Sequence, residues 1–210
     1  MQFPPILVIN LDHRKDKWEQ IQKDFQDWTV KLERVSAIKH DTGWKGCYLS
    51  HLKCVKIAKE RNYPWVLYLE DDCMLAPGAK QRFTKLLPFL WYARPHWDFF
   101  MGGLTGVTGC ALINEGETVY IARGFGAHFC LIHSNTYDRI LDIMDIEPGE
   151  PGEPGEPDEP CDSLYRSAMR LWITVPFLAK QYAGYSDISD THKDSYSEYD
   201  EAEQMLKLIL

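Results

Sequence analysis

Three consecutive acidic residues, Glu70, Asp71 and Asp72, stand between two apolar stretches in the segment VLYLEDDCML. Adjacent carboxylates repel one another and burial removes their hydration, so such a cluster is costly unless a cation neutralises it. Carboxylate oxygens suit a hard divalent ion such as Mn²⁺ or Mg²⁺, which can also bind the phosphates of a nucleotide. On a strand, Glu70 and Asp72 point to the same side, so we expect them to share one ion. The alternative is an ordinary solvated strand end.

The elements around the triplet place it at the end of a buried strand. Residues 6–10 (ILVIN) and 65–72 (WVLYLEDD) each begin with a continuous apolar run, which is typical of strands that are buried on both faces. Periodicity predicts the other elements: helices over 12–28, 46–62, 78–93 and 134–144, strands over 31–38, 97–103 and 127–134, and hairpins or active-site loops over 104–126. Alternating strands and helices predict an α/β fold, whose ligands bind beyond the carboxyl ends of the strands.

Composition narrows the class of protein. The chain has 210 residues, of which 45% are hydrophobic, and this suits one compact domain. Its net charge of -8 disfavours a nucleic-acid partner. We expect no signal peptide and no membrane span, hence a cytoplasmic protein. The six cysteines lack C-x-x-C spacing, so we expect most of them to be small buried hydrophobes in a reducing compartment.

Two polar segments lie outside these elements. Residues 147–160 contain Gly-Glu-Pro triplets, which are too few for a collagen triple helix and predict an extended surface loop, with an acceptor-contact segment as the alternative. Residues 189–210 are polar and acidic and end in a short amphipathic piece. We therefore predict one domain over 1–188 and a polar acidic tail over 189–210.

Five stretches, in order, resemble the motifs of glycosyltransferase family 25, which includes lipooligosaccharide and collagen hydroxylysine galactosyltransferases. They are LVINLDHRKDKW, GWKGCYLSHLKCVKIA, WVLYLEDDCML, GFGAHFCLIHSNTYDRIL and LAKQYAGYSDI, and together they run from about residue 6 to residue 188. The resemblance implies a GT-A type single domain with a mixed, mostly parallel sheet flanked by helices. It also implies a UDP-sugar donor, a Mn²⁺ ion (or Mg²⁺), and transfer with inversion at the sugar carbon.

The resemblance also implies roles for single residues. The acidic triplet would take the place of a D-x-D motif, with Glu70 and Asp72 as metal ligands. A C-terminal histidine often completes the metal shell in such enzymes, which nominates His192; Asp187 and Asp190 are its competitors. Residues expected near the nucleotide or the sugars are Asn10, Leu11, Arg14, Lys45, Ser50, His51, Asp71, Gly126 and His128. From local structure alone, Arg14 could be exposed, Ser50 could be a helix cap, and His128 could simply line a turn.

Inverting transfer needs a base that removes the proton from the acceptor hydroxyl. Asp162 is the candidate, because it follows the Gly-Glu-Pro run at a predicted helix start and matches an acidic position in the family. Asp162 could instead be an N-cap, in which case Asp158 or Glu159 would be the next candidate for the general base.

The resulting prediction is an inverting, metal-dependent glycosyltransferase. It would move a hexose, galactose or glucose, from a UDP-sugar to a hydroxyl of a glycan or a hydroxylysine-type, collagen-like acceptor. The sequence also leaves open whether the chain forms a homo-oligomer. The alternatives are a metal-dependent nucleotide-sugar hydrolase or phosphodiesterase, and a degenerate transferase that binds UDP-sugar without turnover.

Overall fold

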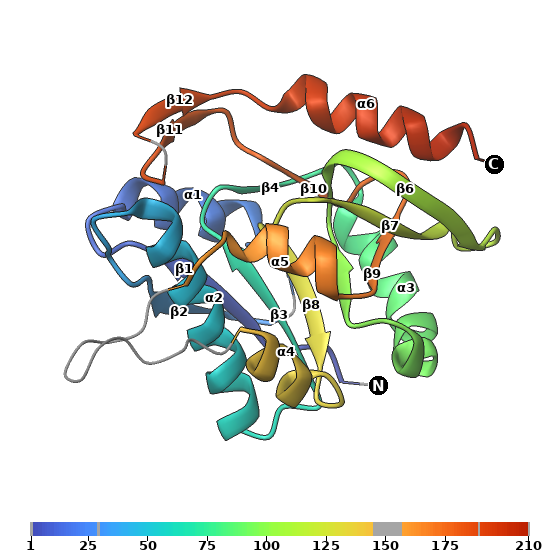
Figure 1. The fold of residues 1–210 in the computed structure, drawn as a ribbon, viewed down its shortest axis with the longest axis horizontal. Helices are drawn as coiled ribbons and strands as arrows, with labels where there is room; N and C mark the ends of the chain where they lie inside the picture. Colours follow the sequence, from blue (N-terminus) through green and yellow to red (C-terminus); the bar gives the residue numbers. More distant parts are fainter. Residues whose placement is uncertain (1, 29, 145–156, 189, 210) are drawn as a thin grey trace.

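A computed structural model describes residues 2–28, 30–144, 157–188 and 190–209 (Figure 1). Its centre is a sheet with the strand order β2-β1-β3-β8-β5-β9-β7-β6. These strands are β1 (Ile6–Asn10), β2 (Leu32–Ser36), β3 (Trp65–Glu70), β5 (Phe99–Met101), β6 (Thr105–Asn114), β7 (Val119–Phe125), β8 (Phe129–His133) and β9 (Leu171–Thr174). The strands predicted at 6–10 and 65–72 are present as β1 and β3, and they pair with each other in the sheet.

The sheet is mixed, as predicted, but less parallel than expected. Strand β1 is parallel to β2 and β3, and β5 is parallel to β9. Strand β8 lies between β3 and β5 and is antiparallel to both, and β7 is antiparallel to β9 and β6. Since β8 opposes both neighbours, β3 and β5 run in the same direction, and their carboxyl ends meet at one edge.

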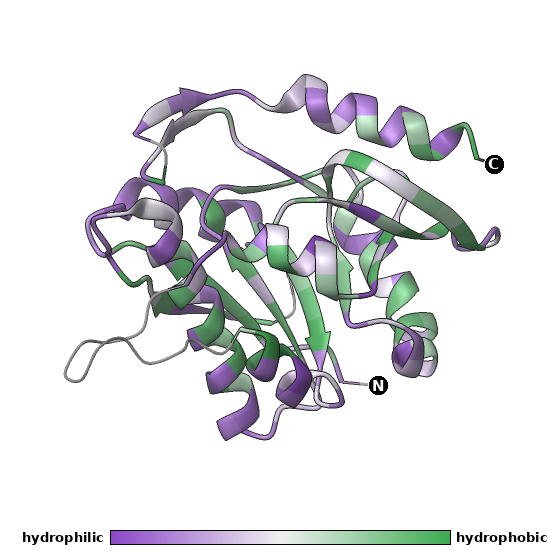
Figure 2. Ribbon diagram, in the orientation of Figure 1, coloured by the Kyte–Doolittle hydropathy of each residue, from purple (hydrophilic) through white to green (hydrophobic). Residues whose placement is uncertain are grey.

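Helices cover both faces of the sheet (Figure 1). Helices α2 (Gly43–Glu60), α4 (Tyr137–Ile143) and α5 (Cys161–Ala168) cover one face, whereas α1 (Lys15–Asp24) and α3 (Ala79–Ala93) cover the other. The side chains of β1 alternate between the two cores: Leu7 faces the first, and Ile6 and Val8 face the second. In Figure 2 the central strand β8 is mostly green, and purple residues are frequent on the helices that cover the sheet. The α/β class is confirmed.

The segment predicted as a polar tail is folded onto the domain. It contains β12 (Thr191–Lys193), which pairs with β11 (Gly184–Ser186), and helix α6 (Tyr196–Lys207). Tyr199, Ala202 and Leu206 of α6 are buried in the same core as α2 and α5. The boundary at residue 188 therefore does not separate a tail from the core. Three apolar positions on one helix face are sufficient for docking, although the segment as a whole is acidic.

Other short elements complete the described fold. Strand β4 (Cys73–Leu75) pairs with β10 (Ala179–Gln181), which brings Gln181 beside the acidic triplet. A 3₁₀ helix, η1 (Arg94–His96), precedes β5. Most of the Gly-Glu-Pro run, up to residue 156, lies outside the described residues, so its predicted loop conformation stays a prediction. None of the helices in the described ranges combines the length and apolarity that a membrane crossing needs.

Candidate active site

The carboxyl ends of three parallel strands meet at the acidic triplet. Asn10 ends β1, Ser36 ends β2 and Glu70 ends β3, and the register aligns Asn10 with Ser36 and Ile9 with Glu70. This is the edge at which the strand order predicted a ligand site.

The Glu70 carboxylate is bound on both oxygens. Its Oε1 lies 3.0 Å from His51 Nε2 and accepts a 3.5 Å hydrogen bond from Cys47 Sγ, while Oε2 accepts one of 3.1 Å from Gln181 Nε2. Burial alone would raise the pKa of Glu70, but the hydrogen bond and charge of His51 outweigh burial and lower it to about 2. Burial likewise opposes charge on His51, and its contacts with Cys47 and Glu70 raise its pKa to about 10. Glu70 and His51 are thus in direct contact, and each favours the charged form of the other.

Asp72 is the least neutralised carboxylate of the triplet. The Gln181 amide that contacts Glu70 also lies 3.4 Å from Asp72 Oδ1, so these two carboxylates lie close together across the turn that follows β3. Lys17 Nζ lies 3.4 Å from Asp71 Oδ1 but 3.9 Å from Asp72 Oδ2. Burial, followed by the charge of Glu70, raises the pKa of Asp72 to about 7.

Asp71 is anchored to the end of β1. Its Oδ2 accepts a 2.7 Å hydrogen bond from Asn10 Nδ2, and Asn10 in turn accepts one of 2.7 Å from Arg34 Nε. Three convergent carboxylates therefore face one nearby lysine ammonium, and this donor set of hard oxygens fits a divalent cation such as Mn²⁺ or Mg²⁺.

Two clefts share Asp71 and Asp72 of the triplet as a wall. The first has a volume of about 470 Å³ and is lined by Asn10, Leu11 and Ser50 together with all three acids. The second has a volume of about 400 Å³ and is lined by Arg14 and Gln181. Lining residues common to both are Lys17, Asp71, Asp72, Tyr185, Ser186 and Ile188. The segment 184–188 thus divides one larger hollow into two.

Segment 184–188 is held down by its own contacts. Asp187 forms an ion pair with Arg14, and its Oδ1 lies 3.4 Å from His13 Nε2. A side chain at Gly43 would bring its Cβ within 2.4 Å of the Ile188 carbonyl oxygen, so the close approach of the backbone there requires glycine. Arg14 is therefore largely buried and paired, not a solvent-exposed residue of the first helical turn.

Ser50 connects helix α2 to the segment after β2. Its Oγ donates to the Gly46 carbonyl at 2.7 Å and accepts from the Ile38 N–H at 2.8 Å. Helix α2 begins at Gly43, with Thr42 at the N-cap, so Ser50 is not the cap. It supports the floor of the first cleft, which Ile38 also lines.

The remaining predicted residues lie outside both clefts, within the described part of the chain. Lys45 lies over the ring of Trp44. Gly126 adopts a φ of 139°, a conformation that favours glycine. His128 is buried, and its Nδ1 is 3.2 Å from Tyr199 Oη. His192 is exposed on β12 and packs edge-on against Tyr185, so the structure does not bring it to the carboxylates.

Asp162 lies in the first turn of α5, where its Oδ1 accepts a 2.9 Å hydrogen bond from the Ser163 N–H. The N-cap position belongs to Pro160, so Asp162 is not the cap. Burial, and then the charge of Glu70, raise the pKa of Asp162 above its usual value. Its neighbour Cys161 approaches Cys47, which lines the first cleft, so the start of α5 lies next to the site.

Several residues of the site were missed from sequence. Lys17 and Gln181 contact the acids, and Cys47 and Cys161 lie beside Glu70 and His51. Lys17 follows Arg14 by one helical turn, which is a usable signal. Gln181 is brought in by a three-residue strand and Cys161 by a separate helix, and neither has a local signature.

Comparison with known proteins finds similarity in the segment that contains the acidic triplet. Residues 42–93, which include α2, β3 and the acidic triplet, match the model of "Glycosyltransferase family 25 (LPS biosynthesis protein)". This segment is similar to glycosyltransferase family 25. Procollagen galactosyltransferases 1-B and 1-A of Xenopus laevis are 28% and 26% identical over 49% of this chain. The match covers 21% of the length of each of these two relatives.

Two solved structures show weaker similarity. A glycosyltransferase involved in the glycosylation of the major capsid of PBCV-1 has a TM-score of 0.48 at 12% identity, covering 98% of this chain and all of that one. UDP-glucose pyrophosphorylase complexed with UDP-glucose also has a TM-score of 0.48 at 12% identity, covering 97% of this chain and 81% of that one. Values below 0.5 do not establish a shared fold, so the α/β assignment rests on the strand order itself.

Proposed function

We propose that this chain is an inverting, metal-dependent glycosyltransferase of GT-A type. It transfers a hexose, galactose or glucose, from a UDP-sugar to a hydroxyl of a glycan or hydroxylysine-type acceptor. The observation that carries the proposal is the position of Asp71 and Asp72 on the wall shared by two clefts, at the carboxyl ends of parallel strands. The relation to family 25 supports the same reaction.

The donor is assigned to the first cleft. Asn10 and Leu11 line it next to the acids, and a cleft of about 470 Å³ is of the size that small ligands occupy. Lys17 lies between the two clefts and would contact the diphosphate. Glu70 and Asp72 would hold the divalent cation, and Asp187, which lines the same cleft as both acids, would be the third ligand in place of His192. When bound, that cation supplies positive charge to the departing diphosphate.

Asp162 is assigned as the general base. In the reaction, the acceptor oxygen forms a bond to the anomeric carbon, the bond from that carbon to the UDP oxygen breaks, and the acceptor proton passes to Asp162 Oδ2. Its Oδ1 is fixed by the Ser163 N–H, which orients the carboxylate. The raised pKa of Asp162 favours its work as a base, because a more basic carboxylate accepts a proton more readily.

Turnover of UDP-galactose and UDP-glucose, with and without an acceptor sugar, tests the proposal. UDP release that requires the acceptor is the expected result. Release at the same rate without any acceptor would favour the hydrolase, and UDP binding without release would favour the degenerate transferase.

Asp162→Asn sharpens this test. Asparagine keeps the shape of the side chain but cannot take the acceptor proton, so turnover should fall by about 10²- to 10⁴-fold while UDP binding persists. Asp138→Asn, which changes an exposed carboxylate on α4, is the matched control and should retain turnover. Near-normal turnover in Asp162→Asn would move the base elsewhere.

A further inference from the structure

A second set of metal-ligating side chains lies behind the acidic triplet. Cys47 Sγ, Cys161 Sγ and a ring nitrogen of His51 all lie within 4.8 Å of one another. They come from α2 and α5, two helices that pack against each other on one face of the sheet (Figure 1). His51 and Cys161 are buried, whereas Cys47 is partly exposed and lines the first cleft.

Glu70 adds an oxygen to this set. Its Oε1 lies 3.0 Å from His51 Nε2 and 3.5 Å from Cys47 Sγ. In a tetrahedral zinc site the usual bond lengths put neighbouring nitrogen and oxygen ligands about 3.4 Å apart, and sulfur and oxygen ligands about 3.6 Å apart. The observed separations are close to both values. The other oxygen, Oε2, points to Gln181 and Asp72, so Glu70 faces the acidic site with a different atom.

We propose that Cys47, His51, Cys161 and the Oε1 atom of Glu70 bind one zinc ion. Two sulfur donors and one imidazole select a soft or borderline ion such as Zn²⁺, whereas the oxygen ligands proposed for the donor's cation, Glu70 Oε2 and Asp72, select Mn²⁺ or Mg²⁺. The ion enters through the first cleft, where Cys47 is accessible.

The consequence is a crosslink between two helices. Zinc bound to α2 through Cys47 and to α5 through Cys161 fixes the first turn of α5, which carries Asp162. The sulfur atoms of Cys47 and Cys161 lie within 4.8 Å of each other. Two sulfurs bound to one zinc ion are roughly 3.8 Å apart, so the two helices would need to approach each other only slightly.

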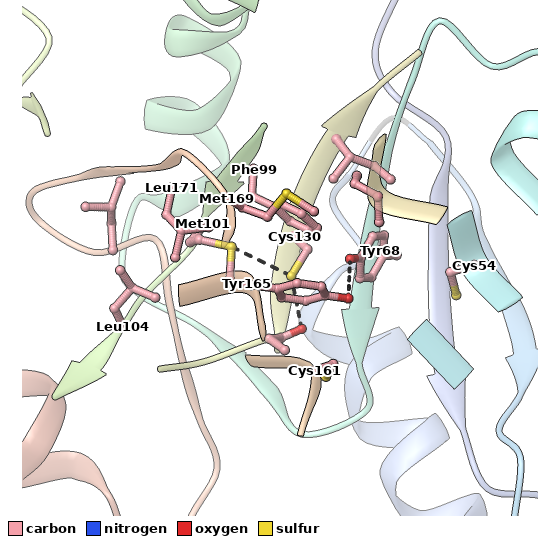
Figure 3. Packing of buried hydrophobic residues seen from close by; sticks show 14 of the residues in the cluster. Cys54, Tyr68, Phe99, Met101, Leu104, Cys130, Cys161, Tyr165, Met169 and Leu171 are labelled. Atoms are coloured by element: carbon pink, nitrogen blue, oxygen red, sulfur yellow. Dashed lines mark hydrogen bonds between the residues drawn. The ribbon is translucent and has the colours of Figure 1, made fainter. Parts of the chain in front are cut away.

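Anaerobic titration of the reduced full chain with Co²⁺ tests this site, because tetrahedral cobalt bound to thiolates absorbs in the near-ultraviolet and the visible. We expect both bands to saturate at one ion per chain and Zn²⁺ to displace them. Cys161→Ser should lose the near-ultraviolet intensity of one thiolate. Cys54→Ser should keep the wild-type spectrum, since Cys54 is a buried cysteine of α2 that lies well apart from Cys161 (Figure 3).

A second measurement does not depend on any variant. One equivalent of Zn²⁺ should raise the melting temperature of the wild-type chain, because the ion binds the folded arrangement and not the unfolded chain. The proposal is overturned if no thiolate band forms at one equivalent, if the Cys161→Ser spectrum equals that of the wild type, or if Zn²⁺ leaves the melting temperature unchanged.

Discussion

Two carboxylate sites at opposite ends of the strands, Asp98 (buried) and Asp72 (partly buried), are neutralised to very different degrees. Asp98 precedes β5 at the amino edge, and it is bound by the Arg170 backbone N–H at 2.8 Å, by Arg170 Nη2 at 2.7 Å and by Arg139 Nη1 at 3.4 Å. At the carboxyl edge, Asp72 has a lysine ammonium at 3.9 Å and a glutamine amide at 3.4 Å.

The pKa values follow this difference. Burial would raise the pKa of Asp98, but the hydrogen bonds of Arg170 outweigh burial and hold it below the usual value. For Asp72 burial prevails, the charge of Glu70 adds to it, and the pKa rises to about 7. A carboxylate that only stabilises a fold is surrounded by cations, as Asp98 is. Asp72 is short of positive charge, which is the condition expected of a site that binds a cation as a ligand.

The largest expected effect is at Asp98. Asp98→Ala should lower the free energy of unfolding by about 3 kcal/mol, because the Arg170 N–H and two guanidinium groups lose their acceptor. Urea unfolding measures this, and Asp138→Ala, at an exposed surface ion pair, should cost under about 1 kcal/mol. An equal loss of unfolding free energy in the two variants would contradict the structural role of Asp98.

The contribution of Asp98 to the free energy of unfolding should also depend on pH. Its folded pKa lies below the unfolded value of 3.8, so the unfolded chain binds the proton first as the pH falls. The stabilisation by Asp98 is therefore complete above about pH 5 and is lost as the pH drops through the folded pKa. The stability difference between wild type and Asp98→Asn, measured from pH 3 to 6, should narrow on the acid side. A difference that is constant over this range would contradict the lowered pKa.

At Asp72 the expected change in stability is smaller and opposite in sign. Asp72→Asn removes repulsion from Glu70 and Asp71, so the free energy of unfolding in the absence of divalent ions should rise by about 1 kcal/mol at pH 8. Thermal or urea unfolding in the presence of a chelator is the measurement. A clear loss of stability would show that Asp72 is structural, like Asp98.

The strands of the fold were largely predictable. The runs at 6–9, 65–69 and 129–132 are apolar throughout, because the interior of a strand that is buried on both faces favours apolar residues. The antiparallel insertion of β8 between β3 and β5 was not predictable, since strand direction depends on pairings between residues far apart in the chain. Helix α6 was mistaken for a tail because the other side chains of its segment are mostly polar.

Only those residues of the candidate site that follow a local sequence signal could be predicted. Asp71, Asp72 and Asn10 end neighbouring strands, and strand ends can be found from hydropathy. Gln181 contacts Asp72 across 109 residues and Cys161 approaches Cys47 across a segment that includes the Gly-Glu-Pro run. Such contacts come from tertiary packing, which leaves no spacing rule in the sequence.

Calorimetric titration of UDP, with and without Mn²⁺, into the wild-type chain and Asp72→Asn tests the central claim most directly. We predict that Mn²⁺ strengthens UDP binding to the wild type, and that this gain disappears in Asp72→Asn while Asp138→Asn keeps it. The same Mn²⁺-dependent gain in Asp72→Asn as in the wild type would contradict the assignment of the acidic triplet to a nucleotide-bound cation.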